Sequence, residues 1–171
     1  MFRRLHPRLI PAGLFCVFSL LATIVEARDW HVSPKGNDSN SGEAASRPFR
    51  SLQKAADRAE PGDTVFLGEG VYPAPEDSDI NTNALVTLSK TGRPDAWITF
   101  KAAPGAKPEL RPLGWNGIFV TGSYYVLDGL AITGANDSIR LIDAIKEEKN
   151  PKPNPYYNTN GISIDGRKNP P

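Results

Sequence analysis

A seven-residue phrase that occurs twice constrains the fold of this chain more than any other feature of its sequence. Residues 116–122 read Asn-Gly-Ile-Phe-Val-Thr-Gly, and residues 160–166, which lie 44 positions later, read Asn-Gly-Ile-Ser-Ile-Asp-Gly. Each copy is a short apolar strand between small turn residues, and strands this short are not stable alone. Two copies of one turn-strand-turn unit therefore predict a repeat architecture.

The rest of the chain supplies more strands of the same kind. The distance from Ile98 to Ile118 is 20 residues, which is close to one turn of a solenoid whose coils each hold about three short strands. The 16 prolines and 15 glycines favour short elements joined by turns. Tight two-residue hairpin turns do not separate the strands, so we predict an all-β fold, a right-handed parallel β-helix.

One segment departs from the strand pattern and has the period of an amphipathic helix. From about 49 to 60, Phe49, Leu52 and three alanines fall on one helical face and charged residues on the other. Ser51 or Pro48 marks its start, and Pro61 follows its end. The end of a coil stack is an open apolar cross-section, so we expect this helix to cap the first coil.

The first 27 residues have the pattern of a secretory signal peptide. Three arginines precede an apolar run from Leu14 to Val25, and Val25-Glu26-Ala27 fits the small-residue rule at a cleavage site. An uncleaved membrane anchor is the alternative, but the apolar run is shorter than the roughly 20 residues that span a bilayer. We predict cleavage after Ala27, a domain covering residues 28–171, and a secreted or periplasmic protein without a membrane anchor.

Composition excludes several classes of function for the mature chain. Its single cysteine, Cys16, lies in the predicted signal, which excludes disulfides and a thiolate catalyst. Removing residues 1–27 leaves 17 Lys and Arg against 18 Asp and Glu, so nothing favours nucleic acid as a partner. A metal site would have to use carboxylates, carbonyls or His31, although His31 fits a structural role better.

Several phrases also carry a family resemblance. Residues 30–38 (WHVSPKGND), 48–55 (PFRSLQKA), 61–65 (PGDTV) and 98–105 (ITFKAAPG) resemble the N-terminal cap and first coils of secreted bacterial right-handed β-helix proteins, among them pectate-lyase-like polysaccharide lyases. The resemblance implies an N-terminal piece of a longer lyase, with a β-helix incomplete at its C-terminus. In such lyases the calcium carboxylates and the catalytic base lie on later coils. The resemblance therefore identifies no catalytic residue here and implies that this chain alone is inactive.

An insertion of about 135–160 interrupts the coil rhythm, because a coil of about 22 residues accounts for only half of the 44-residue displacement. Insertions on a solenoid rim are common binding surfaces. Within it, Asn136 or Asp137 could cap a short helix whose isoleucines share one side. Tyr156 and Tyr157 could stack on sugar rings as substrate-binding residues, or simply pack the insertion onto its coil.

Calcium is the cofactor that the residues and the resemblance suggest. If Ile162 and Ile164 face the core, alternation places Asp165 outside, where its carboxylate could bind the metal. An Asp-Gly turn is the structural alternative for Asp165, as it is for Asp63 and Asp128. The loop at 37–40 has suitable oxygens but lacks the spacing of a calcium loop. Lys101 and Arg111 could act as bases or substrate clamps only if each shares a face with a carboxylate.

Two classes of function follow from the sequence. The first is the N-terminal portion of a secreted polysaccharide lyase that acts on a uronate-containing polysaccharide by β-elimination, with a glycoside hydrolase as the variant chemistry. The second is a noncatalytic surface or carbohydrate-binding β-helix protein, because the same scaffold can carry either kind of site. A cluster of Asp with a Lys or Arg on later coils would favour the lyase.

Overall fold

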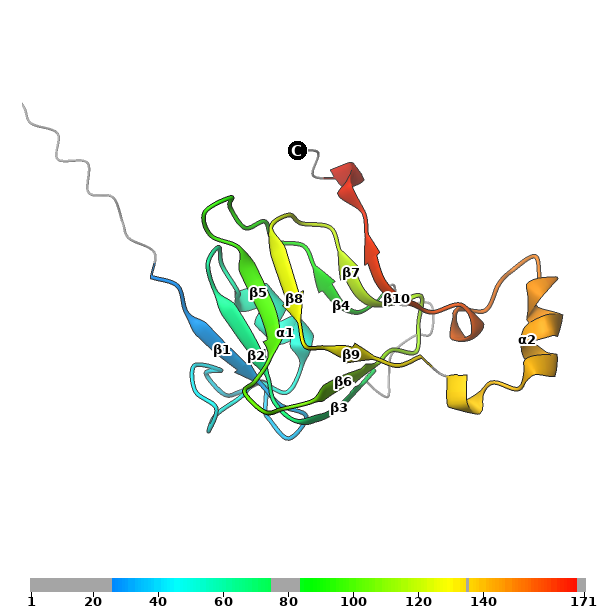
Figure 1. The fold of residues 1–171 in the computed structure, drawn as a ribbon, viewed down its shortest axis with the longest axis horizontal. Coiled ribbons are helices and arrows are strands. Elements are labelled where there is room, and N and C mark those ends of the chain that lie inside the picture. Colours follow the sequence, from blue (N-terminus) through cyan, green and yellow to red (C-terminus); the bar gives the residue numbers. More distant parts are fainter. Residues whose placement is uncertain (1–25, 75–83, 135, 169–171) are drawn as a thin grey trace, which may run out of the picture.

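The computed structural model describes residues 26–74, 84–134 and 136–168, and its strands form three parallel sheets (Figure 1). The first sheet contains β1 (Asp29–Val32), β2 (Thr64–Leu67), β5 (Ile98–Ala102) and β8 (Tyr125–Asp128) in that order. The second contains β3 (Gly70–Pro73), β6 (Pro108–Arg111) and β9 (Ala131–Ile132). The third contains β4 (Ala84–Leu88), β7 (Asn116–Val120) and β10 (Asn160–Ile164).

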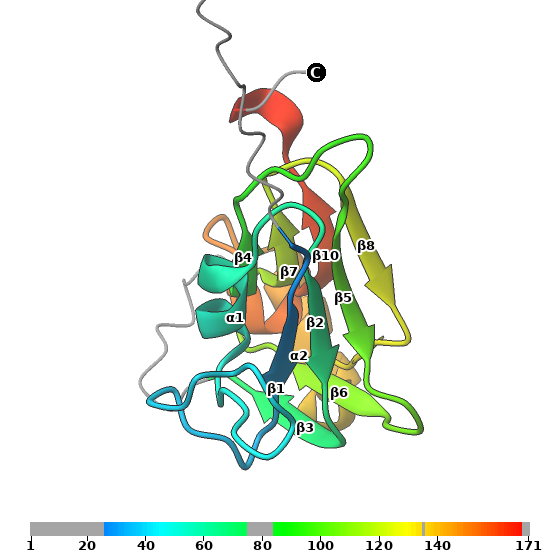
Figure 2. The same ribbon diagram turned by 90° about the vertical axis from the view of Figure 1, so that its left-hand side faces the viewer.

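β1 and β2 are neighbours in the first sheet, but from β2 onward consecutive strands belong to different sheets, so the chain winds through three coils. β2, β3 and β4 make the first coil, β5, β6 and β7 the second, and β8, β9 and β10 the third. Figure 2 shows the four strands of the first sheet, β1, β2, β5 and β8, side by side. This arrangement confirms the predicted parallel β-helix.

The repeated phrase is a stacking register. Asn116 lies opposite Asn160, and Ile118 lies opposite Ile162, in the parallel pair of β7 and β10. The asparagine amides are also close, with Asn160 Nδ2 at 3.5 Å from Asn116 Oδ1. The 44-residue displacement therefore spans one coil that carries the insertion. The expected coil of about 20–22 residues was too short, because Val86 and Ile118, which are paired on successive coils, lie 32 residues apart. Ile98 and Ile118 lie on different sheets of one coil.

The core lies inside the coils, where alternate residues of each strand point inward. Equivalent positions on successive coils form columns of buried side chains. These columns are Val65 over Phe100 in the first sheet, Tyr72 over Leu110 in the second and Val86 over Ile118 in the third. Buried side chains from all three sheets thus meet in one continuous apolar interior.

The predicted capping helix is α1 (Leu52–Arg58), which is shorter at both ends than the expected 49–60. Phe49 forms an isolated parallel bridge with Val32, and Ser51 is extended, so the helix cannot begin before Leu52. The Ser51 side chain accepts a hydrogen bond from Lys54 N at 3.2 Å, which is the expected N-cap. Leu52 and two alanines are buried beneath the helix.

A single glutamine joins the helix to the sheet that it covers. Gln53 Oε1 accepts a hydrogen bond from Thr87 N at 2.9 Å, and Gln53 Nε2 donates to Thr87 O at 3.2 Å. The side-chain amide thus takes the place of a neighbouring strand at the edge of β4, beside α1 in Figure 2. The helix caps the end of the coil by hydrogen bonding as well as by apolar cover.

Asp38 connects the polar loop after β1 to the start of α1. Its Oδ1 accepts hydrogen bonds from Arg50 N at 2.8 Å and Ser51 N at 2.9 Å. Burial alone would raise the pKa of Asp38, but the hydrogen bonds from Ser51 and Arg50 and the charge of Lys54 outweigh it and lower the pKa. The loop that the sequence offered as a calcium candidate thus uses its carboxylate to hold backbone amides.

The insertion extends away from the coils as three short helices (Figure 1). They are η1 (Asn136–Ser138), α2 (Leu141–Glu148) and η2 (Pro155–Tyr157). The expected cap was wrong, because Asn136 and Asp137 form η1 and Arg140 is the N-cap of α2 without a side-chain bond. Ile142 and Ile145 are exposed by 53% and 48%, so this face of α2 has little cover.

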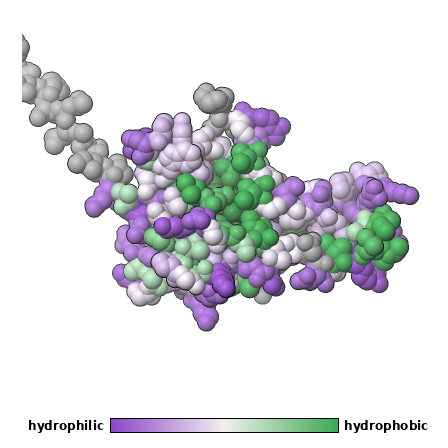
Figure 3. Space-filling model, viewed as in Figure 1, coloured by the Kyte–Doolittle hydropathy of each residue, from purple (hydrophilic) through white to green (hydrophobic). Residues whose placement is uncertain are grey.

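The last coil exposes apolar side chains that its register places above buried ones. Ile162 and Ile164 are 48% and 78% exposed, although they lie opposite Ile118 and Val120, which are 2% and 6% exposed. Figure 3 shows hydrophobic surface over this coil and a second patch at the end of the insertion. In the part of the chain that the structure describes, no strand pairs with the far edge of β10.

Candidate functional site

A cavity of about 280 Å³ lies where the insertion meets the second and third coils. Its walls come from the turn after β6, from β9 and β10, and from the two ends of the insertion. The residues that line it are Pro112, Ile132, Gly134, Ile139, Tyr156, Tyr157, Asn158, Thr159 and Gly161. This volume lies just below the roughly 300–1,000 Å³ typical of small-molecule sites.

Tyr156 and Tyr157 form an aromatic wall of this cavity. Their rings meet edge to face, with centroids 5.3 Å apart and planes at 88°. Tyr156 OH donates to Ser138 Oγ at 2.9 Å, which joins the two ends of the insertion. Tyr156 therefore has the packing role that the sequence offered as an alternative, while both half-buried rings also border the cavity.

Local hydrogen bonding fixes the segment that carries both tyrosines. Asn154 Oδ1 accepts from Tyr156 N at 3.0 Å and caps η2, while Pro155 is buried at the first position of the helix. Thr159 Oγ1 donates to the Pro155 carbonyl at 3.2 Å. These bonds hold the aromatic pair at a defined place beside the coils.

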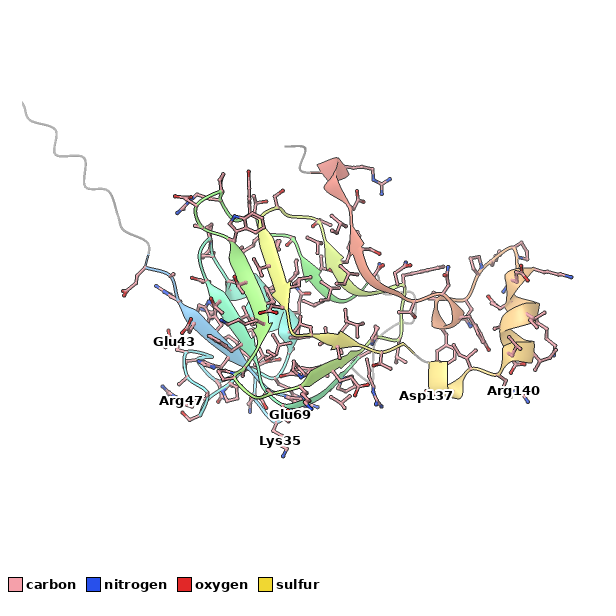
Figure 4. The ribbon with its side chains drawn as sticks, viewed as in Figure 1. Lys35, Glu43, Arg47, Glu69, Asp137 and Arg140 are labelled. Atoms are coloured by element: carbon pink, nitrogen blue, oxygen red, sulfur yellow. The ribbon has the colours of Figure 1, made fainter. Side chains whose placement is uncertain are left out.

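Two arginines of this region, Arg111 and Arg140, are already paired. Arg111 Nε donates to Glu109 Oε1 at 2.9 Å, and this hydrogen bond lowers the pKa of Glu109. Arg140 binds both oxygens of Asp143, at 2.7 and 3.1 Å. The charge of Asp137 also contributes to the raised pKa of Arg111, and Figure 4 shows Asp137 and Arg140 together on the insertion. Each guanidinium thus already has a carboxylate partner.

Asp165 follows β10 and does not line the cavity. Its Oδ1 accepts from Arg167 N at 3.1 Å, which is the hydrogen bond of an Asx turn, the alternative suggested by the sequence. The Arg167 guanidinium also binds both carboxylate oxygens, at 2.8 and 2.7 Å. A metal ion at this carboxylate would have to displace that guanidinium.

No three His, Cys, Asp or Glu side chains gather as a metal cluster among the residues that the structure describes. Calcium favours six to eight oxygen ligands, usually with several carboxylates. The described residues therefore do not fit a preformed calcium site, and calcium binding stays a prediction.

Lys101 and Arg111, the two candidate cations, lie on different sheets. Lys101 lies on β5 in register with Asp128, and its Nζ is 5.0 Å from the centroid of the Phe66 ring. Arg111 lies on β6 and pairs with Glu109. Each cation thus shares a strand or sheet with a carboxylate, but Lys101 and Arg111 do not lie at one common site.

His31 has the structural surroundings that its place in the sequence favoured. Its ring stacks on Phe66 with centroids 5.5 Å apart, on the sheet that also carries Lys101. Figure 4 shows Glu43 and Arg47, on the loop between β1 and α1, at the opposite end of the molecule from the insertion.

Sequence reasoning missed most of the cavity. Pro112, Asn158 and Thr159 line it, yet none belongs to a motif with recognisable spacing. The one usable signal was that the insertion returns to the coils directly after the two tyrosines. Residues between the tyrosines and β10, such as Asn158 and Thr159, lie beside the coils because the chain re-enters the sheet directly after them.

Comparisons with known proteins agree with the architecture. The family model for a "Pel9A-like, right handed beta helix region" matches residues 30–167. Pectate lyase L of Dickeya dadantii is 28% identical over 128 residues, which cover 70% of this chain and 29% of that protein. Pectate lyase PEL9 of Emericella nidulans is 32% identical over 89 residues, covering 52% and 20%. This chain thus spans less than a third of the curated relatives' length.

Solved structures give the same result. The crystal structure of pectate lyase Pel9A matches with a TM-score of 0.54 and 28% identity, covering 63% of this chain and 28% of that one. A rhamnogalacturonan lyase matches with a TM-score of 0.51 and 24% identity, a likeness of fold. These matches confirm the right-handed parallel β-helix. No described helix of this chain is long and apolar enough to cross a membrane.

Proposed function

This chain belongs to the family of Pel9A-like right-handed β-helix proteins, and on that premise we propose that it forms the N-terminal cap and first coils of an exported polysaccharide lyase. The match over residues 30–167 is the observation that carries the proposal. Two relatives are named pectate lyases, which supports a uronate-containing polysaccharide as the substrate.

The proposed reaction is β-elimination. A base removes the proton from the carbon next to the uronate carboxylate, the bond to the leaving oxygen breaks, and a carbon–carbon double bond forms. A cation must neutralise the carboxylate so that the carbanion-like state is accessible. Of the two cations that the sequence offered as bases, Arg111 is tied to Glu109, and Lys101 lies on another sheet with its Nζ 5.0 Å from the centroid of the Phe66 ring. We therefore assign proton abstraction to a part of the protein outside these coils.

The role we assign to these coils is binding of one sugar residue at the cavity. Tyr157 offers a half-buried ring, and Asn158 and Thr159 supply polar groups beside it. Sugar rings stack on aromatic side chains through their apolar faces while their hydroxyl groups need hydrogen-bond partners. A site of this kind would increase affinity for the polymer without taking part in the chemistry.

The test uses the protein purified from its complete gene and polygalacturonate with calcium, followed by the absorbance of the unsaturated product. We expect Tyr157→Ala to raise KM several-fold and to leave kcat nearly unchanged, because an interaction made equally in ground and transition states affects only KM. Tyr124→Ala is the matched control, since Tyr124 is 38% exposed and packs on Trp97 away from the cavity. An unchanged KM for Tyr157→Ala would refute the sugar site.

The same assay separates the alternatives. Polymer binding without product would favour a noncatalytic carbohydrate-binding protein, and new reducing ends without absorbance would favour a glycoside hydrolase. Residues 28–171 alone should give no product. Calcium-dependent product from that chain that is lost in Asp165→Ala would overturn the inactive-chain proposal and support a metal role for Asp165.

A further inference from the structure

The most deeply buried carboxylate among the described residues lies at the start of the first coil. Asp63 is 1% exposed and precedes β2. Its oxygens accept three hydrogen bonds, from Arg28 N at 2.8 Å, Trp30 Nε1 at 2.8 Å and Glu60 N at 2.9 Å. The side chain thus ties the first strand, the end of the helix segment and the first coil together.

This carboxylate has donors but no cationic partner. The ion pairs of residues 26–74, 84–134 and 136–168 do not include Asp63. A buried charge is costly unless hydrogen bonds and an opposite charge compensate it. The Asp63 carboxylate is therefore well supplied with hydrogen-bond donors, but no positive charge in the described part of the chain compensates its negative charge.

One of the three donors is the atom that signal removal would change. Arg28 N is the amide nitrogen of the residue that follows the predicted cleavage position after Ala27. Hydrolysis by a leader-removing protease adds water across the Ala27–Arg28 bond, so the carboxylate leaves with Ala27 and the amine stays on Arg28. That amine has an ordinary pKa of about 8 and is mostly protonated at neutral pH.

We propose that cleavage after Ala27 creates an α-ammonium group on Arg28 that forms an internal ion pair with buried Asp63. The nitrogen is already 2.8 Å from Asp63 Oδ1, and Thr64 N donates to the Arg28 carbonyl at 2.9 Å, so the residue is held on both sides. Before cleavage only the acceptor of this hydrogen bond is charged, whereas after cleavage an ammonium donor faces the carboxylate and the contact becomes an ion pair as well as a hydrogen bond. The folded domain thereby gains stability from its own processing.

The position of the new terminus is decisive. A chain that begins at Ala27 has its ammonium one residue away, about 3.8 Å along the backbone, and keeps a neutral amide at Arg28. A chain that begins at Asp29 lacks this donor altogether. Only a start at Arg28 places the positive charge against the buried carboxylate.

The first experiment is intact-mass measurement of the exported protein. The expected mass corresponds to a chain that begins at Arg28. A chain that retains residues 1–27, or that begins at any other residue, overturns the proposal.

The second experiment compares the thermal unfolding of the exported protein with three N-termini: Arg28, Ala27 and N-acetylated Arg28. The free Arg28 terminus should raise the Tm by about 2–4 °C over both others, a shift of the size that a single interaction causes in a domain of about 150 residues. The difference should vanish in Asp63→Asn and persist in Asp29→Asn, whose carboxylate is adjacent but exposed. Equal Tm values for the three termini, or a difference that survives in Asp63→Asn, overturn the proposal.

A third measurement does not depend on the folding of any variant. Reductive methylation of the α-amine should be at least several-fold slower for the chain that begins at Arg28 than for the chain that begins at Ala27. Unfolding in urea should remove that difference. Equal native rates would overturn the proposal.

Discussion

Gly117 and Gly161 occupy the same place in the two copies of the repeated phrase, yet the structure assigns them opposite tolerance to a side chain. A Cβ on Gly117 would lie 2.6 Å from the Gly161 carbonyl oxygen and 2.7 Å from Ile132 Cγ2. A Cβ on Gly161 would have no atom within 4 Å. Neither glycine has a positive φ, so steric contact alone separates them.

The cost of Gly117→Ala follows from these distances. Ordinary contact begins at 3.4 Å, so the carbonyl of Gly161 would have to retreat by about 0.8 Å. That carbonyl belongs to β10, which is held to β7 by the hydrogen bonds of a parallel ladder, so its retreat would strain those bonds. Overpacking of this kind costs about 1–3 kcal/mol. The reduced entropy of the unfolded chain offsets about 0.4–1 kcal/mol of this cost, which leaves a net loss of up to about 2.6 kcal/mol, or about 1.3 kcal/mol from the midpoints of both ranges.

Gly161→Ala also lowers the conformational entropy of the unfolded chain, and it does so without a steric clash, so it should be neutral or slightly stabilising. Urea unfolding of both variants and the parent, with comparable m values, gives the two free energies of unfolding. The reasoning fails if both variants have the stability of the parent, or if Gly161→Ala is the more damaging change.

Three further predictions concern the capping helix, a buried tyrosine of β3 and the loop that holds the start of the helix. Leu52→Asp places a charge at a site 4% exposed and should cost about 3 kcal/mol or more in urea unfolding; unchanged stability would mean that the helix is not a cap. Tyr72→Phe removes hydrogen bonds to the Val32 and Gly68 carbonyls, at 3.0 and 2.9 Å, and should cost about 1–2 kcal/mol in the same assay, with a smaller loss counting against those bonds. The lowered pKa of Asp38 means that its stabilising contribution is present above its ordinary value near 3.8 and is lost as pH falls through the lower folded value. Asp38→Asn should therefore flatten the loss of stability below about pH 4 in acid unfolding, and an unchanged acid profile would contradict this assignment.

The candidate site depended on contacts that no local pattern contains. The sequence placed Tyr156 and Tyr157 beside the coils but left open whether they pack or bind. The structure shows that Tyr156 bonds Ser138 across the insertion and that both rings border a cavity. Tyr156 and Ser138 are 18 residues apart in the sequence, so no local pattern predicts that they form a hydrogen bond.

Local periodicity determined most of the fold. The similarity of 116–122 and 160–166 predicted the stacking register, because equivalent residues of successive coils lie opposite each other in a parallel β-helix. The helical period after Phe49 predicted α1 because a side chain's face follows from 3.6 residues per turn, whatever the tertiary structure. Its ends were less predictable, since Phe49 pairs with Val32 instead of joining the helix.

Tertiary structure alone decided the burial, the partners and the sheet assignment of individual residues. Ile164 repeats the position of buried Val120, yet it is 78% exposed, because burial depends on what covers the next layer. Asp63 read as a turn residue, and only the folded chain brings Arg28, 35 residues away, to its carboxylate. Lys101 and Arg111 are ten residues apart but lie on different sheets, because turn geometry rather than side-chain pattern assigns each strand to a face.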